Sequence, residues 1–233
     1  MQVALLVVDS LPKYAYLFAE FSVRTLSRSL DIAVFGSGRG SNFQAILTAI
    51  QQGAIPNAAI RVVISNNSSA GILEIARANG IPAEHISEKQ FTHATDFVNH
   101  LLATLHAYGV NFIVLAGYMK RVPQQIISQF RNSIVNIHPA LLPKFGGQGM
   151  YGMRVHEAVL AAHERITGAS VHFVDEEYDR GPLILQRTVA VAPHDTVESL
   201  AAKVLRIEHE LYPEALRMIA EGKIPSGVHS SNE

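Results

Sequence analysis

The order of elements in the fold is indicated by residues 32–42, which read IAVFGSGRGSN, and by residues 43–52, which continue as FQAILTAIQQ. The apolar run Ile32 to Phe35 predicts a buried strand, and the apolar residues after Ser41 recur at the three- and four-residue spacing of a helix. Ser41 and Gln44 have the spacing of a capping box, and Gly53 marks the end of this helix over 41–52. A strand that passes through a glycine-rich turn into a helix is the typical first unit of a parallel α/β sheet.

The same alternation continues along the chain until Gly168, where it changes. Strands 170–174 and 183–191 are joined by a turn rather than by a helix, and Asp195 and Glu198 are expected to cap the last helix. We therefore predict an α/β fold with a mostly parallel, Rossmann-like twisted sheet, helices on both faces and a late antiparallel or mixed extension. The other elements expected are strands at 60–65, 83–86, 112–116 and 134–137, helices at 70–79 and 95–108, and a short helix starting at Pro123.

Composition limits the classes of partner. The chain has 233 residues, 48% apolar and 17% charged, and its net charge of −1 gives no broad basic surface for nucleic acid. The apolar run Val3 to Val8 is too short to span a membrane. No cysteine is present, which excludes a thiolate nucleophile and is compatible with the cytoplasm. We expect an N-terminal extension at 1–30, one domain at 31–225 and a loose tail at 226–233.

Asn136 and His138 stand at the end of the predicted strand 134–137 and are followed by Pro139. Residues two apart on an extended backbone project from the same face, so an amide and an imidazole can reach one reacting atom. In the alternative interpretation, Asn136 starts a turn and His138 is only hydrogen-bonded at the sheet edge. This motif alone leaves both interpretations open.

The glycine-rich loop 36–42 is a second candidate site. Its glycines let backbone N–H groups approach an anion at the positive end of the following helix. It is not a P-loop, because no Gly-Lys-Ser/Thr closes it, and residues 65–67 after the next strand offer no acid for the ribose of NAD. A phosphate monoester is therefore favoured over a dinucleotide. The alternative is a tight turn that needs glycine backbone angles.

Asp179 lies in the turn between the two late strands, where Asp and Gly are common for local reasons. The turn follows the strand that carries His172, and a carboxylate can keep a catalytic imidazole protonated near neutral pH. Asn136, His138 and Asp179 would then form an acid–base set without a nucleophilic side chain. Such a set suits a transfer reaction in which the substrate brings its own nucleophile.

Six motifs occur in order: GRGSN at 38–42, VVISN at 62–66, LAGYM at 115–119, NIHPALLP at 136–143, SVHFV at 170–174 and DRGP at 179–182. On these motifs the chain from about Asp31 to Ile224 resembles the phosphoribosylglycinamide formyltransferases, folate-dependent enzymes of purine biosynthesis. The Asn-x-His pair and the later Asp belong to all folate formyl-transfer domains of this fold. Gly-Ser-Asn in the first loop points to the glycinamide ribonucleotide enzymes within that group.

The resemblance implies that the co-substrate 10-formyltetrahydrofolate gives its formyl group to the amine of 5-phosphoribosylglycinamide. Asn136 would donate a hydrogen bond to the tetrahedral oxyanion, while His138, kept cationic by Asp179, would stabilise it and relay the proton to the folate nitrogen. No metal and no covalent intermediate are required. The residues implied to bind the two substrates are Gly40, Ser41, Asn42 and Glu208 for the ribonucleotide, and Met119, Lys120, Arg121, Val122 and Asn136 for the folate.

Three questions stay open at this point. Residues 144–152 form a longer glycine-rich loop than we associate with the bacterial enzymes, and we interpret it as a lid that excludes water. In the alternative interpretation, the loop is a flexible connection with no gating role. Other possible functions are a hydrolase like formyltetrahydrofolate deformylase, which normally carries a regulatory domain first, and a non-catalytic nucleotide-binding module. The expected assembly is a monomer or homodimer.

Overall fold

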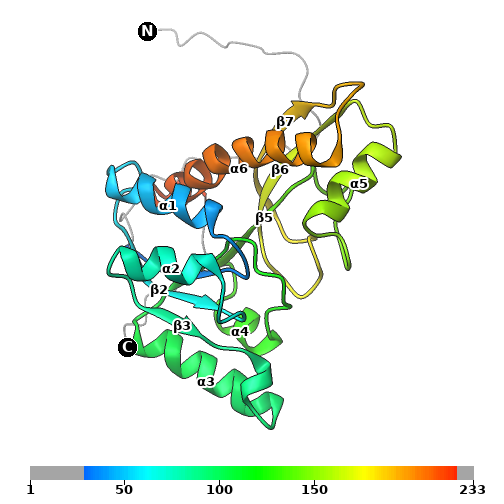
Figure 1. The fold of residues 1–233 in the computed structure, drawn as a ribbon. Coiled ribbons are helices and arrows are strands. Elements are labelled where there is room, and N and C mark those ends of the chain that lie inside the picture. Colours follow the sequence, from blue (N-terminus) through cyan, green and yellow to red (C-terminus); the bar gives the residue numbers. More distant parts are fainter. Residues whose placement is uncertain (1–28, 225–233) are drawn as a thin grey trace, which may run out of the picture.

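The computed structural model describes residues 29–224, so the predicted tail at 226–233 and nearly all of the predicted extension at 1–30 lie outside the described residues. One seven-stranded sheet has the order β3-β2-β1-β4-β5-β6-β7 (Figure 1). Its parallel strands are β1 (Leu30–Phe35), β2 (Ala58–Ser65), β3 (Ala83–His85), β4 (Phe112–Leu115) and β5 (Ile134–His138). The antiparallel strands β6 (Ile166–Phe173) and β7 (Leu183–Ala190) complete it. The predicted fold class is confirmed.

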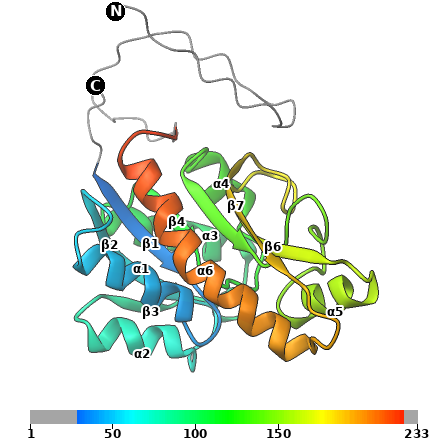
Figure 2. The same ribbon diagram turned by 90° about the horizontal axis from the view of Figure 1, so that it is seen from above.

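Helices cover both faces of this sheet (Figures 1 and 2). Because side chains alternate along a strand, Ile32 and Val34 of β1 face one apolar cluster while Ala33 and Phe35 face the other. The first cluster lies under α1 (Ser41–Gln51), α2 (Gly71–Ala78), α5 (Met153–Ala161) and α6 (Val197–Ala220). The second lies under α3 (Ala94–Ala107) and α4 (Gln124–Gln129), and a short 3-10 turn, η1 (Glu88–Gln90), precedes α3.

The start of α1 differs from the prediction. Gly40 is the N-cap residue, with a φ of 84°, and Ser41 is the first helical residue and caps nothing. A Cβ at Gly40 would lie 2.8 Å from the Cα of Ile72, so both the positive φ and the close approach of α2 require glycine. No side chain in the described part of the chain caps this helix, and its first N–H groups remain available to a ligand.

The start of α6 also corrects the prediction. Thr196 is the N-cap residue and accepts a hydrogen bond from the N–H of Ser199, so Asp195 and Glu198 do not form the cap. Asp195 instead accepts hydrogen bonds from the hydroxyl of Ser199 and from Lys203. Both predictions failed because the backbone conformation of the cap residue, and not only the spacing of polar residues, decides which side chain reaches the free N–H groups.

The order of the strands in the sheet locates the candidate site. The chain passes from β1 to β2 on one side, and β4, which follows β3 in the chain, lies on the other side of β1. The strand order therefore reverses between β1 and β4, and sheets of this kind bind ligands outside the carboxyl ends of the strands at such a reversal. The loop after β1 and the segment after β4 both begin there, and β5 ends beside them. Within residues 29–224, no helix has the length and apolar character needed to cross a membrane.

The turn that carries Asp179 is packed against the end of β6. A Cβ at Gly181 would lie 1.9 Å from the carbonyl oxygen of Phe173, and a main-chain atom cannot rotate aside. We expect Gly181→Ala to lower the free energy of unfolding by about 2 kcal/mol or more, measured by urea denaturation. Gly38→Ala is the matched control, because nothing lies within 4 Å of its Cβ position. Equal stability of the two variants would contradict this account of the turn.

Candidate active site

A cavity of about 730 Å³ lies at the carboxyl ends of β1, β4 and β5. It is lined by every residue that the sequence analysis proposed for catalysis or substrate binding, although these residues come from distant parts of the chain. The lining segments are 38–42, 115–122, 136–139, 147–154 and 174–179, together with Glu208 of α6.

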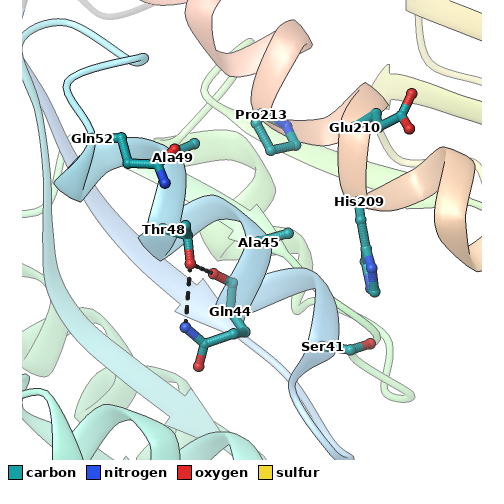
Figure 3. Close-up of a pocket in the computed structure, with 9 residues that line it drawn as sticks. All are labelled: Ser41, Gln44, Ala45, Thr48, Ala49, Gln52, His209, Glu210 and Pro213. Carbon is teal, nitrogen blue, oxygen red and sulfur yellow. Dashed lines mark hydrogen bonds between the residues drawn. The ribbon is translucent and has the colours of Figure 1, made fainter.

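A second hollow, of about 480 Å³, lies between α1 and α6 (Figure 3). It is lined by one face of α1, where Gln44 and Thr48 bond to each other, and by His209 and Pro213 of α6. Of the residues proposed from sequence, only Ser41 borders it. The candidate active site is therefore the larger cavity at the strand ends.

Asn136 is oriented by a neighbour on the next strand. The antiparallel register of β5 and β6 pairs Asn136 with His172, and Nδ2 of Asn136 lies 3.2 Å from Nε2 of His172. Nδ1 of His172 lies 2.8 Å from the carbonyl oxygen of Phe173, so we assign the His172 proton to Nδ1 and let Nε2 accept from Asn136. The second amide hydrogen of Asn136 is then free for a ligand. Sequence placed His172 only beside the site, because strand register cannot be read from one strand.

His138 is almost fully buried, with 3% of its surface exposed. Its Nε2 lies 2.7 Å from the carbonyl oxygen of Phe145, and its Nδ1 lies 3.6 Å from Oδ2 of Asp179. Burial lowers the pKa of His138 by more than the Asp179 carboxylate and the Phe145 carbonyl raise it. Removal of the ring from water thus opposes the cationic form in the free protein, and the role of Asp179 in keeping His138 cationic stays a prediction.

Asp179 lies between the two imidazoles and keeps its negative charge. Its Oδ2 accepts the N–H of Gly147 at 2.8 Å, and its Oδ1 lies 3.5 Å from Nε2 of His172. Burial alone would raise the pKa of Asp179, but a proton on either neighbouring imidazole and the Gly147 N–H favour the carboxylate and lower this pKa below its ordinary value. A positive charge that develops on His138 during a reaction would therefore meet an ionised carboxylate.

The glycine-rich loop 144–152 touches this set directly. Phe145 contacts His138 through its carbonyl, Gly147 contacts Asp179 through its N–H, and a Cβ at Gly146 would lie 3.2 Å from the Cβ of Asp179. The loop is thus part of the candidate site. That it opens and closes as a lid stays a prediction.

At the other end of the cavity, Nδ2 of Asn42 donates to Oε2 of Glu208 at 2.6 Å. Both residues are buried, and Oδ1 of Asn42 has no hydrogen-bond partner among the described residues. Burial raises the pKa of Glu208 to about 7, although the bond from Asn42 opposes this. An unpaired amide oxygen beside a carboxyl group at a helix N-terminus suits a ligand that offers hydrogen-bond donors as well as an anion.

Glu208 should make folding stability depend on pH. Its pKa is about 7 when folded and near 4.5 when unfolded, so the folded state binds more protons in this window and stability falls as pH rises through it. The loss amounts to about 3 kcal/mol at the top of the window. We expect urea denaturation at pH 5 and pH 8 to show this loss in the native protein and not in Glu208→Gln, which keeps an acceptor for Asn42. The same pH dependence in both proteins would exclude this cause.

The segment after β4 lines the cavity with residues 115–122. Val122 is buried, and Met119 is 52% exposed. Arg121 turns toward the segment before Asp179, donating to the carbonyl of Glu176 at 3.1 Å and lying over the ring of Tyr178 at 5.3 Å. The folate contacts assigned to these residues stay a prediction.

The fold and the Asn, His and Asp set at its strand ends define the class of formyl transferases, and the formyl transferase family model matches residues 30–216. The phosphoribosylglycinamide formyltransferase, chloroplastic, of Vigna unguiculata is 42% identical over 88% of this chain, which spans 65% of the length of that relative. The solved glycinamide ribonucleotide transformylase 1 of Symbiobacterium toebii is 41% identical, with a TM-score of 0.79 over 86% of this chain and 92% of that one. The chain therefore belongs to the formyl transferase family, among its phosphoribosylglycinamide formyltransferases.

A solved formyltetrahydrofolate deformylase from Pseudomonas syringae pv. tomato is also similar in structure. Its TM-score is 0.74 over 88% of this chain and 65% of that one, at 23% identity. At this identity the likeness shows a shared fold alone, so the hydrolase is the more distant of the two enzyme types.

Proposed function

We propose that this protein transfers the formyl group of 10-formyltetrahydrofolate to the amine of 5-phosphoribosylglycinamide, giving formylglycinamide ribonucleotide and tetrahydrofolate. The observation that carries the proposal is one cavity lined by Asn136, His138 and Asp179 together with two unlike sets of residues. One set is the uncapped N-terminus of α1 with Glu208, and the other is the segment 117–122. The names of the similar enzymes support the same reaction.

This arrangement suggests which residues would bind each of the two substrates. The free N–H groups at Gly40, Ser41 and Asn42 would hold the phosphate of the ribonucleotide, and Glu208 would accept hydrogen bonds from the same substrate. Met119, Lys120, Arg121 and Val122 would hold the folate ring system across the cavity. The amine and the formyl carbon then meet beside Asn136.

The reaction needs charge stabilisation and one proton transfer. Attack of the amine on the formyl carbon makes a tetrahedral oxyanion, and the free amide hydrogen of Asn136 would donate to it. His138, neutral in the free protein, would take the proton that the amine loses and pass it to the departing folate nitrogen. Asp179 would stabilise the imidazolium that exists between these two steps.

One assay separates this function from the alternatives. The protein is incubated with 10-formyltetrahydrofolate, with and without 5-phosphoribosylglycinamide, and tetrahydrofolate formation is followed. We expect product only when the amine is present, and a rate about 100-fold lower with Asp179→Asn. Equal rates without the amine would indicate a hydrolase, and no product in either case would indicate a binding module.

Other expectations stay predictions. The reaction as proposed requires no metal, and small molecules are the proposed ligands. A monomer or homodimer is the expected assembly. We retain the cytoplasm as the proposed compartment, although the Vigna relative is named as chloroplastic.

A further inference from the structure

We propose that Ser37 is a positioning residue that sets the affinity for the folate co-substrate by holding the backbone of residues 117–119. The inference rests on the proposed function, since it assumes that this segment contacts the folate. Ser37 itself does not line the cavity, and no role was assigned to it from the sequence.

The end of β1 holds the segment after β4 at three successive points. The N–H of Ala116 donates to the carbonyl of Phe35 at 2.7 Å, and the N–H of Ser37 donates to the carbonyl of Gly117 at 3.0 Å. The N–H of Met119 then donates to the hydroxyl oxygen of Ser37 at 2.8 Å. Ser37 thus forms hydrogen bonds to the segment on both sides of Tyr118.

These contacts matter because the segment has no regular structure of its own. Residues 116–123 lie between β4 and α4, and Gly117 turns the chain with a φ of 74°. Among the described residues, Met119 forms no other backbone hydrogen bond through its N–H. Without the Ser37 hydroxyl, the turn is fixed on one side only, so the cavity-lining residues 117–119 lose their fixed position.

Asn66, which directly follows β2, is the second hydrogen-bond partner of the Ser37 hydroxyl. The hydroxyl of Ser37 donates its proton to Oδ1 of Asn66 at 2.5 Å, which leaves the oxygen lone pairs for Met119. Three neighbouring strand ends, β1, β2 and β4, are therefore joined by one hydroxyl group. Ser37 also directly precedes the loop 38–42. It therefore links this loop to the segment after β4, and these are the two segments proposed to bind the substrates.

Steady-state kinetics of Ser37→Ala tests the proposal. We expect the KM for 10-formyltetrahydrofolate to rise about 10-fold, the size of one lost hydrogen bond of about 1.4 kcal/mol. The KM for 5-phosphoribosylglycinamide and kcat should change less than about 3-fold. The Kd of tetrahydrofolate, measured by calorimetry without turnover, should rise by the same factor as the KM.

Four further variants make the test specific. Asn66→Ala should raise the same KM, and the double variant with Ser37→Ala should show less than the product of the two effects. Ser37→Thr keeps the hydroxyl and should restore most of the affinity. Ser69→Ala, whose exposed hydroxyl bonds Asn67 in the neighbouring turn, should leave the KM unchanged.

The outcomes separate this inference from the proposed function. A native protein that forms no product contradicts the proposed function, whatever the variants do. An active native protein with an unchanged folate KM and Kd in Ser37→Ala overturns the positioning role. Equal rises in both KM values, together with a lower melting temperature, would overturn it too, because they indicate general damage.

Discussion

Replacing Asn136 by alanine is expected to lower kcat by about 100-fold to 1000-fold, the usual effect of removing one oxyanion donor. The amide of Asn136 has one hydrogen engaged by His172 and one free, and the free hydrogen gains its full strength only when the oxyanion forms. The KM values for both substrates should therefore stay within a few-fold. Initial rates at saturating concentrations of both substrates measure this effect.

The matched controls are His172→Ala and Asn42→Ala. His172 holds the amide but does not itself face the oxyanion, so its loss should lower kcat by about 10-fold only. Asn42 lies at the other end of the cavity, and its loss should raise the KM for the ribonucleotide instead. If Asn136→Ala retains more than about a tenth of the native kcat, Asn136 is not the oxyanion donor.

Asp179→Asn is expected to lower kcat by about 100-fold, because the imidazolium formed on His138 loses the charge that faces it. Asparagine is the suitable replacement. Asp179 has a φ of 56°, and Asn tolerates this left-handed conformation as Asp does, so the turn should keep its shape. Thermal unfolding should show a folded variant, which separates loss of charge from loss of structure. A variant that retains more than about a tenth of the native kcat would exclude the charge as the main contribution.

The pH dependence of this pair tests the protonation state of His138. The neutral imidazole is the proposed active form, so the native kcat should fall as pH drops through a pKa below 6.5. Since the Asp179 carboxylate raises that pKa against burial, Asp179→Asn should move the acid limb to still lower pH. Rates between pH 5 and pH 8 measure both limbs. A native kcat that instead falls as pH rises through this pKa would indicate that the cation is the active form.

Much of the fold was predictable from local pattern. The apolar runs such as Ile113 to Leu115 are buried on both faces, and this is why they appear as continuous rather than alternating stretches. The residues proposed for catalysis were also predictable, because Asn136, His138 and Asp179 stand in short motifs at a strand end or in a turn. The substrate-binding residues, Glu208 of α6 among them, came from the family resemblance. The cavity contains all of them.

Other features depend on groups that are far apart in the sequence. His172 orients Asn136 only because β6 runs antiparallel to β5 with that register. Ser37 and Met119 are 82 residues apart in the chain, and Ser37 contacts Met119 only because β1 and β4 are neighbours in the sheet. Neither contact leaves a periodic or local signal, so the sequence analysis did not find their roles.

The sequence by itself determined the alternation of strands and helices and the class of fold, and it singled out the side chains proposed to react, since these depend on local spacing and residue type. Only the tertiary structure decided the charges in the site. Burial lowers the pKa of His138 and raises that of Glu208 to about 7, while the groups around Asp179 lower its pKa. The reason is physical: a pKa responds to lost water and to every neighbouring charge, and these are known only once the chain has closed around the group.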